Sequence, residues 1–210
     1  MVMVTHSPQI ATTERVQVDR RYLRLKSTLD WLLALAMLIV LAPIMLFIAL
    51  LIRLDSRGPA CHRQQRVGQG KELFTIFKFR TMRSDTPDLS TEEMQRRGLN
   101  PVTRIGTVLR KTSLDELPQL LNILRGDMSF IGPRPALPSQ VDVNIKRELL
   151  GVHQVRPGIT GLAQVMGRDD LDTATKVNYD ADYCRRMSLW FDARLMIMTC
   201  TAIISSHGNK

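Results

Sequence analysis

One uncharged and strongly apolar segment stands out near the N-terminus of the chain. It runs from Trp31 to Ile52 and reads WLLALAMLIVLAPIMLFIALLI. A helix over these residues rises about 33 Å, which is close to the thickness of a bilayer core. Pro43 lies near its middle, where proline removes a backbone hydrogen bond and bends a helix. The pattern therefore predicts a membrane helix that is broken at Pro43.

Basic residues flank this apolar segment on both sides. Those before it are Arg20, Arg21, Arg24 and Lys26, and those after it are Arg53, Arg57, Arg63 and Arg66. Positive charges collect on the cytoplasmic side of membranes, so a re-entrant helix satisfies this rule at both ends and a spanning helix at one end. The pattern alone leaves both topologies open, because spanning helices also tolerate proline.

After Gly58-Pro59 the chain becomes polar, and its pattern predicts a small β-element. The sequence 68–70 (GQG) predicts a turn, and strand-forming residues fill 72–80. Alternation along such a strand puts Lys78 and Arg80 on one side of it.

Helical spacing predicts most of the remaining elements. The expected helices cover 114–124, 141–150 and 173–204, and a short helix is expected at 90–97 within a surface excursion over 84–101. Prolines and glycines predict irregular or turn-like backbone over 130–138 and 156–161. Basic residues beside Trp190 and Phe191 suit a helix in the membrane interface, with a core helix as the alternative.

Charge and cysteine usage narrow the partners. With 29 Lys+Arg against 20 Asp+Glu, the net charge of +9 suits nucleic acid, an anionic membrane or a phosphorylated substrate. The few aromatic residues and the lack of a recognisable module argue against nucleic acid. Cys61, Cys184 and Cys200 form no CxxC pair, which favours free thiols in a reducing compartment.

The chain contains no Walker A, GxGxxG, HExxH or GxSxG pattern, and its strongest chemical feature is an acidic pair. Asp115 and Glu116 follow two cations in RKTSLDELPQ, residues 110–119. Ser113 and Glu116 have the spacing of a helix capping box, which favours a purely structural interpretation. Pro118 fits that interpretation poorly unless the helix starts near Asp115.

A functional interpretation of the pair has clear physics. An Asp attacks a phosphoryl group only when ionised, and two unit charges 4 Å apart repel by about 4 kcal/mol at an effective dielectric of 20. Uncompensated, this slows a step roughly a thousandfold. A divalent metal held by Glu116 and arginines on the phosphates would remove the penalty, and a helix N-terminus would keep both carboxylates ionised. The candidate cations are Lys78, Arg80, Arg110 and Arg134.

Several longer segments, taken in order, resemble one family. They are 26–30 (KSTLD), the helix split by Pro43, 78–82 (KFRTM), 110–119, 126–135 (GDMSFIGPRP) and 156–161 (RPGITG). Together they resemble the bacterial sugar transferases, or monotopic phosphoglycosyl transferases, from about Lys26 to Asp192.

The resemblance implies a reaction and a role for each motif residue. Asp115 matches the nucleophile that attacks a UDP-sugar, releases UMP and carries the phospho-sugar until polyprenyl (undecaprenyl) phosphate accepts it. Glu116, with Asp115, is assigned to Mg²⁺. Arg134 and Pro135 would hold phosphate and nucleotide, supported by Arg110, and Asp180 matches a late Asp near the nucleotide.

The resemblance also implies how the chain sits in the membrane. The split helix re-enters the cytoplasmic face of the bacterial inner membrane, and Lys26, Asp30 and Pro43 are its lipid-side residues. Two positions depart from the family pattern. Ser27 replaces an Arg, for which Arg24 is a candidate substitute, and Ala42 replaces the Ser before the proline.

We therefore expect an α+β, mostly helical fold with a re-entrant membrane helix, amphipathic interface helices and a small β-element. Residues 1–19 form a flexible arm, 20–55 the membrane segment with its basic lead-in, and 56–210 a catalytic domain on the cytoplasmic face. The membrane face and the 24 kDa size permit a homodimer. The motifs specify neither the sugar nor the glycan pathway.

Two other functions compete with this one. A membrane-anchored scaffold would explain the charge and the apolar segment, but it leaves Asp115-Glu116 and the 133–135 turn without purpose. A folded but inactive relative is the other, and the presence of the motif carboxylates and arginines argues against it.

Overall fold

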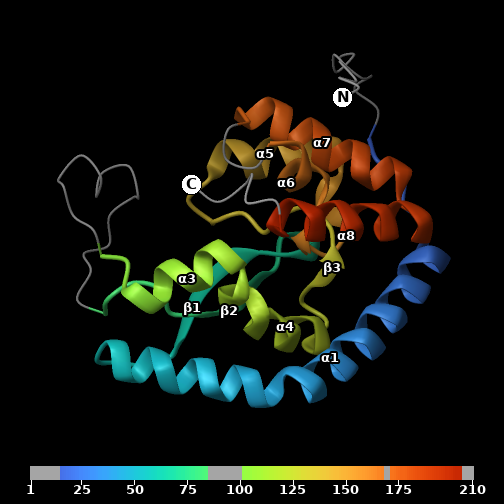
Figure 1. The fold of residues 1–210 in the computed structure, drawn as a ribbon. Coiled ribbons are helices and arrows are strands. Elements are labelled where there is room, and N and C mark those ends of the chain that lie inside the picture. Colours follow the sequence, from blue (N-terminus) through green and yellow to red (C-terminus); the bar gives the residue numbers. More distant parts are fainter. Residues whose placement is uncertain (1–14, 85–100, 168–170, 205–210) are drawn as a thin grey trace, which may run out of the picture.

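The structure is a computed structural model that describes residues 15–84, 101–167 and 171–204. Its elements, in chain order, are α1 (Arg20–Asp55), β1 (Cys61–Val67), η1 (Gln69–Lys71), β2 (Leu73–Phe79), α3 (Arg104–Thr112), η2 (Leu114–Gln119), α4 (Leu120–Arg125), β3 (Ser129–Ile131), α5 (Val141–Leu150), η3 (Val152–Gln154), β4 (Gly158–Thr160), α6 (Leu162–Met166), α7 (Thr173–Arg186) and α8 (Leu189–Ile204). The fold is mostly helical with a small amount of sheet, as the sequence predicts (Figure 1).

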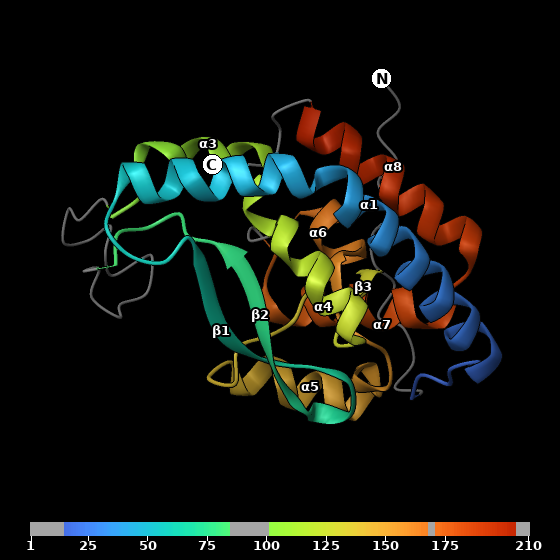
Figure 2. The same ribbon diagram turned by 90° about the horizontal axis from the view of Figure 1, so that it is seen from below.

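Helix α1 is one continuous helix of 36 residues that contains Pro43. Figures 1 and 2 show it bending between its N-terminal and C-terminal halves, so that it wraps one side of the molecule. It begins where the Asp19 carboxylate accepts a hydrogen bond of 2.8 Å from the Arg21 amide, which satisfies a free helix donor. The basic lead-in is therefore helical and continuous with the apolar segment.

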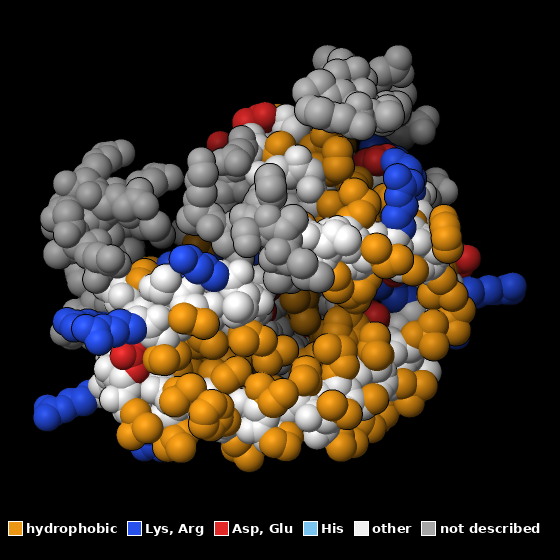
Figure 3. Space-filling model, in the orientation of Figure 1, with side chains coloured by type: hydrophobic (Ala, Val, Ile, Leu, Met, Phe, Trp, Pro, Cys, Tyr) orange, Lys and Arg blue, Asp and Glu red, His pale blue; other side chains and the backbone are white. Residues whose placement is uncertain are grey.

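Both halves of α1 pack on the rest of the protein. Ala34 is fully buried in the main core, whereas Ile48 and Ile52 pack in a second core against Phe79 and Leu109. The opposite side of α1 is apolar and exposed, and Figure 3 shows these side chains gathered along the edge of the molecule. By length and composition α1 is able to cross a membrane.

The hairpin of β1 and β2 is antiparallel, and its tight turn contains Gly70 at φ 64°. The strand and the turn over 68–70 are as predicted. The sequence did not indicate β1, because CHRQQRV carries little apolar alternation. Its pairing with the strongly strand-forming β2 explains why it forms.

Strands β3 and β4 form a short parallel pair, with Ser129 opposite Gly158 and Ile131 opposite Thr160. The prediction of irregular backbone is wrong for these two stretches. Glycine explains the difference, since a Cβ on Gly158 would lie 2.1 Å from the Gly132 nitrogen. Only glycine allows the two backbones to come this close.

Asn122 joins α4 to β2 in the core. Its side-chain oxygen accepts from the Phe77 amide at 3.0 Å, and its side-chain nitrogen donates to the Thr75 carbonyl at 2.7 Å. Asn122 is fully buried. Because α4 directly follows η2, these bonds fix η2 against the strand that carries Lys78.

The remaining helix predictions hold with local changes. Residues 114–124 are helical, but the first turn is a 3₁₀ turn, η2, and the helix ends at Gly126 with φ 84°. The predicted helix over 173–204 is interrupted at Met187-Ser188. Helix α5 and its closing Gly151 are confirmed.

Helix α8 combines the two alternatives that its sequence left open. Leu195 is fully buried in the main core, whereas Trp190 is 81% exposed. One side of α8 is thus a core helix, and the other presents an aromatic side chain to the surroundings.

Parts of two predictions fall outside the described residues. These are the flexible arm over 1–14 and the excursion with its short helix over 85–100. Within the arm as predicted, however, Val16 is 2% exposed and its amide donates to the Leu150 carbonyl at 2.9 Å. The end of the predicted arm is therefore a packed part of the fold.

Candidate active site

Asp115 and Glu116 lie in the first turn of η2, directly after α3. The two helices meet at Ser113, whose backbone is left-handed with φ 57°. The Ser113 side chain caps no helix, and only its carbonyl accepts a bond, from the Glu116 amide at 3.2 Å. The capping-box interpretation is therefore wrong, and the Glu116 side chain is directed elsewhere.

Glu116 is held between two cations. Its Oε1 atom accepts from Lys78 Nζ at 2.7 Å and from Arg134 Nη2 at 3.1 Å. Burial alone would raise the pKa of Glu116, but Arg134 and Lys78 outweigh it and hold the pKa at about 2. Glu116 is therefore a fixed anion at neutral pH.

Asp115 is in a different state from its neighbour. Burial raises its pKa, and the adjacent Glu116 charge raises it further, while Lys78 and Arg110 act in the opposite direction. Among the residues that the structure describes, no cation lies within ion-pair distance of its carboxylate. We expected a helix N-terminus to keep both carboxylates ionised, but the low pKa of Glu116 comes from Arg134 and Lys78, and that of Asp115 is raised. The Asp115 carboxylate is consequently available for chemistry.

Arg66 is a further cation of this site, which the sequence offered only as a flanking charge. It stands on β1, and its Nη1 donates to the Pro135 carbonyl at 3.1 Å. Burial and the nearby Arg134 lower its pKa to about 10, against an opposing effect of Glu116. Arg66 thus faces the same electrostatic environment as Arg134 and Glu116.

The turn that carries Arg134 is held on both sides by the fold. On one side, the Val67 amide donates to the Ala136 carbonyl at 3.0 Å. On the other, Arg147 Nη1 donates to the Arg134 carbonyl at 2.8 Å. The backbone of Arg134 is therefore fixed, and its half-exposed side chain reaches Glu116.

Asp180 lies behind this turn. It is 1% exposed, and its Oδ2 accepts from Arg147 Nε at 2.9 Å and from Arg147 Nη2 at 2.6 Å. Burial raises the pKa of Asp180, and Arg147 opposes that shift. Asp180 therefore acts through Arg147 on the backbone of Arg134. The sequence did not single out Arg147, because a cation in a predicted helix looks like a surface charge.

The other two predicted cations are placed differently from each other. Arg80 is 6% exposed, and its guanidinium donates to the Arg57 carbonyl at 2.6 Å and to the Ser56 carbonyl at 2.7 Å. It thus caps the C-terminal end of α1. Strand β2 ends at Phe79, so the alternation that would put Arg80 on the same side as Lys78 does not reach it. Arg110 donates from Nε to Thr81 Oγ1 at 2.9 Å while its charge still acts on Asp115.

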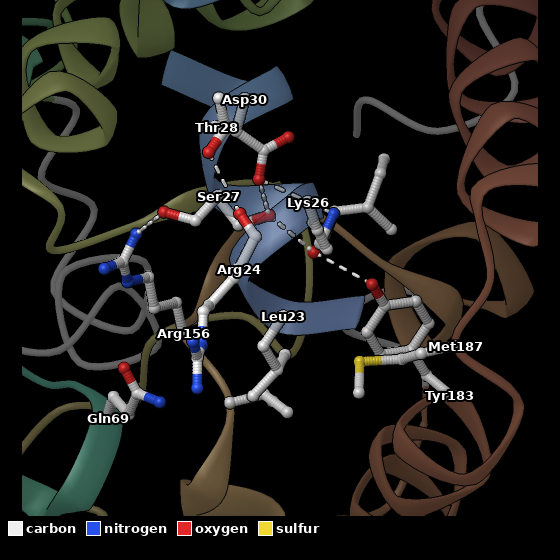
Figure 4. A pocket seen from close by; sticks show the side chains of 13 residues that line it. Leu23, Arg24, Lys26, Ser27, Thr28, Asp30, Gln69, Arg156, Tyr183 and Met187 are labelled. Carbon is white, nitrogen blue, oxygen red and sulfur yellow. Dashed lines mark hydrogen bonds and ion pairs between the residues drawn. The ribbon is translucent and has the colours of Figure 1, made fainter. Parts of the chain in front are cut away.

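Lys26 and Asp30, predicted as lipid-side residues, are internal. Lys26 Nζ lies 3.6 Å from Asp30 Oδ2 (Figure 4). It also lies 2.5 Å from Asp192 Oδ2, and Ser129 Oγ donates to Asp30 Oδ2 at 2.7 Å. A buried charge needs a partner, which explains why these side chains turn inward. They fix the N-terminal half of α1 to α8 and β3. Pro43, in contrast, is exposed.

Comparison with known proteins gives consistent matches to one group. A family model described as bacterial sugar transferase matches residues 7–206. A UDP-glucose:undecaprenyl-phosphate glucose-1-phosphate transferase of Caulobacter vibrioides is 43% identical over 203 residues, which cover 92% of this chain and 73% of the relative.

Two further relatives differ in length, and one of them names a different sugar. A UDP-N-acetylgalactosamine-undecaprenyl-phosphate N-acetylgalactosaminephosphotransferase of Aeromonas hydrophila is 40% identical over 230 residues, which cover 100% of this chain and 54% of the relative. The exopolysaccharide production protein PSS of Rhizobium leguminosarum is 41% identical over 185 residues, covering 83% of this chain and 92% of the relative. The chain thus spans about half of the Aeromonas protein and most of the Rhizobium protein.

The buried pair of Arg147 and Asp180 gives a prediction about stability. Arg147→Met leaves the Asp180 carboxylate buried without its partner, which should cost about 3–5 kcal/mol of unfolding free energy. Denaturant unfolding of the purified chain in detergent measures this, with exposed Arg104→Met as the control. The double change Arg147→Met with Asp180→Leu should recover part of the loss, since it removes the orphaned charge. Equal unfolding free energies of Arg147→Met and the control Arg104→Met would contradict the proposed support of the 133–135 turn by Arg147.

Proposed function

The chain belongs to the bacterial sugar transferase family, and we propose that it transfers a sugar 1-phosphate from a UDP-sugar to undecaprenyl phosphate, releasing UMP. This would be a first membrane step in building a glycoconjugate or exopolysaccharide. The relatives act, by their names, on UDP-glucose or UDP-N-acetylgalactosamine, so the family leaves the sugar open.

The observation that carries the proposal is the unequal state of two adjacent carboxylates. Glu116 is locked between Lys78 and Arg134, whereas Asp115 beside it is in no ion pair with any described residue. A nucleophile must be ionised but uncommitted, and its neighbour must be fixed to organise the substrate. Asp115 therefore suits the role of nucleophile, and Glu116 suits an organising role.

The reaction proceeds in two displacements at one phosphorus atom. A carboxylate oxygen of Asp115 attacks the β-phosphorus of the UDP-sugar, and the bond from that phosphorus to the bridging oxygen breaks, so that UMP leaves. A phosphate oxygen of the lipid then attacks the same phosphorus, and the Asp115 carboxylate leaves. The product is a sugar linked through a diphosphate to the polyprenyl chain. Lys78, Arg134, Arg66 and Arg110 stabilise the phosphate charge in both steps.

The donor set fits Mg²⁺ bound together with the substrate. Within the described residues, no group of three or more His, Cys, Asp or Glu side chains gathers as a metal cage. Mg²⁺ is commonly held by one or two carboxylates together with substrate phosphates, and Glu116 with Asp115 supplies that number. When bound, the ion would neutralise phosphate charge near Asp115.

Helix α1 supports a membrane placement in which the chain enters and leaves on the same face. Its N-terminal half is tied to α8 by the bond from Lys26 to Asp192, and its C-terminal end is tied by Arg80. A helix attached at both ends to one folded body cannot put those ends on opposite sides of a bilayer. The bend that contains Pro43 would then dip into the cytoplasmic leaflet of the inner membrane. This placement brings the active site to the depth of the lipid phosphate.

The first prediction concerns turnover. The wild-type chain should release UMP from one member of a panel of UDP-sugars when undecaprenyl phosphate and Mg²⁺ are present. Asp115→Asn should lower the rate by at least about a thousandfold, because it removes the nucleophile. Exposed Asp142→Asn is the matched control and should retain activity. EDTA should abolish UMP release, and added Mg²⁺ should restore it.

A folded wild-type chain that releases UMP from none of the donors would defeat this proposal. The membrane scaffold would then be the better interpretation. It would be supported by a partner that Asp115→Asn still binds in a pull-down.

The pH dependence of the first displacement follows from Asp115. The reactive form is the carboxylate, so the rate is full above its pKa and falls as the pH drops through it. Since burial and Glu116 raise that pKa, the fall should occur at a higher pH than for an ordinary Asp. Lys78→Met removes a cation that lowers the pKa, and should move the acidic limb to still higher pH. Single-turnover UMP release at a series of pH values measures this. The exposed control Lys146→Met should leave the acidic limb where it is in the wild type. An acidic limb that also stays unmoved in Lys78→Met would exclude Asp115 as the titrating group.

The topology of α1 gives a separate prediction. In a chain whose native cysteines are replaced by serine, single cysteines at Arg21 and Arg57 should react with an impermeant thiol reagent from the same membrane side. Inverted and right-side-out vesicles provide the comparison. Labelling of the two positions from opposite sides would indicate a spanning helix instead.

A further inference from the structure

A cavity of about 330 Å³ lies beside the N-terminal half of α1. Its walls come from α1, from the strand residues Ser129 and Ile131, and from Arg156 and Met187 (Figure 4). None of its lining residues belongs to the proposed transfer site around Asp115. The cavity is therefore a second place where this fold could hold a ligand.

The charges that line the cavity do not balance. Lys26 and Asp30 lie 3.6 Å apart and neutralise each other, while Lys26 is also bound to Asp192. Arg24 and Arg156 remain, and Figure 4 shows both side chains on the side of α1 that carries Ser27. In the described part of the chain, neither arginine is ion-paired. Two unpaired guanidinium groups at one cavity attract an anion, and they suit a phosphate in particular.

The hydroxyl of Ser27 orients one of these arginines. Arg156 Nη1 donates to Ser27 Oγ at 2.6 Å, which leaves its other guanidinium donors directed away from that bond. Arg156 is half-buried, so it is held in place better than a surface arginine. It is also the first residue of the 156–161 segment, for which the transfer reaction supplies no role.

The position of the cavity along α1 matches the depth of lipid headgroups. Arg24 and Ser27 precede Trp31, where the uncharged run begins, by seven and four residues. At 1.5 Å per residue they lie about 10 Å and 6 Å outside the apolar segment, within the headgroup zone that borders the hydrocarbon core. Leu23, Val155 and Met187 add apolar wall to the same cavity. A ligand with a phosphate and an adjoining apolar chain fits both kinds of wall.

We propose that this cavity binds the phosphate of an anionic membrane phospholipid, with Arg24 and Arg156 as its cations. The lipid is held without reacting, because a phosphate bound there is not at Asp115. It would anchor the N-terminal half of α1 at the headgroup level. The inference rests on the proposed membrane placement of α1, but not on the transfer chemistry.

The test uses a soluble probe, so that general attraction to a charged leaflet plays no part. Dihexanoyl phosphatidylglycerol, below its micelle concentration, is titrated into the full chain in a neutral detergent and followed by calorimetry. The double change Arg24→Gln with Arg156→Gln should weaken binding about tenfold or more, because two charge-assisted contacts are lost. Arg21→Gln with Arg53→Gln removes two exposed charges from α1 outside the cavity, and should stay within about twofold of wild type.

A second variant keeps the test decisive if the Arg24→Gln and Arg156→Gln double variant misfolds. Ser27→Asp should pair with Arg156, fill the site with negative charge and abolish binding while the chain stays folded in a thermal unfolding scan. Asp115→Asn should bind the probe normally, so a loss of turnover and a loss of lipid binding remain separate results. Undiminished binding by the Gln pair, or an equal loss in the control pair, would overturn the proposal. Inorganic phosphate serves as the other arm, and if it binds as tightly as the lipid, the cavity is a free-phosphate site instead.

Discussion

A buried carboxylate must be paired with a cation, and the site depends on how Glu116 meets this requirement. Its two partners come from different parts of the chain: Lys78 from β2 and Arg134 from the turn after β3. The ion pairs therefore draw three segments to one point. Asn122 fixes η2 against β2, and Arg147 fixes the backbone of Arg134 from behind. Removing any of these supports would therefore displace Glu116 first, and would affect Asp115 only through that displacement.

The same principle fixes α1 in place. Asp192 is buried and accepts from Lys26 at 2.5 Å and from Tyr183 at 2.8 Å. A charged pair joins α8 to the N-terminal half of α1, while Arg80 caps the other end of α1. An apolar helix that is tied at both ends by buried cations can expose its outer side without detaching from the fold. Lys26 and Asp30, which the sequence predicted to face lipid, thus hold α1 to the rest of the protein.

The sequence predicts secondary-structure elements better than it predicts which side chains contact each other, for physical reasons. The long apolar run, the strand at 72–80 and the glycine that ends α5 depend on local pattern, and all three are confirmed. The β3–β4 pair depends on a close approach of two backbones that are distant in sequence, which local pattern does not encode. For the site, Asp115 and Glu116 stand out as adjacent carboxylates, and the structure brings Lys78 and Arg134 to Glu116. Arg66 and Arg147 look like surface charges in sequence, because only tertiary packing reveals what a cation faces.

The charge balance of the site bears on the order of the two proposed displacements. Four cations, namely Lys78, Arg66, Arg110 and Arg134, face two carboxylates, which leaves two positive charges in excess. A UDP-sugar carries one negative charge on each of its two phosphates, so its diphosphate matches that excess. After UMP leaves, Asp115 has lost its own charge, but the attached phosphodiester carries one in its place. The excess is then again two, and the incoming phosphate monoester of the lipid carries about −1.5 to −2 at neutral pH. The side chains therefore present the same excess before each displacement, and a bound Mg²⁺ would add two positive charges to both steps alike, so one fixed set of cations suits the two substrates in turn, as a ping-pong scheme requires.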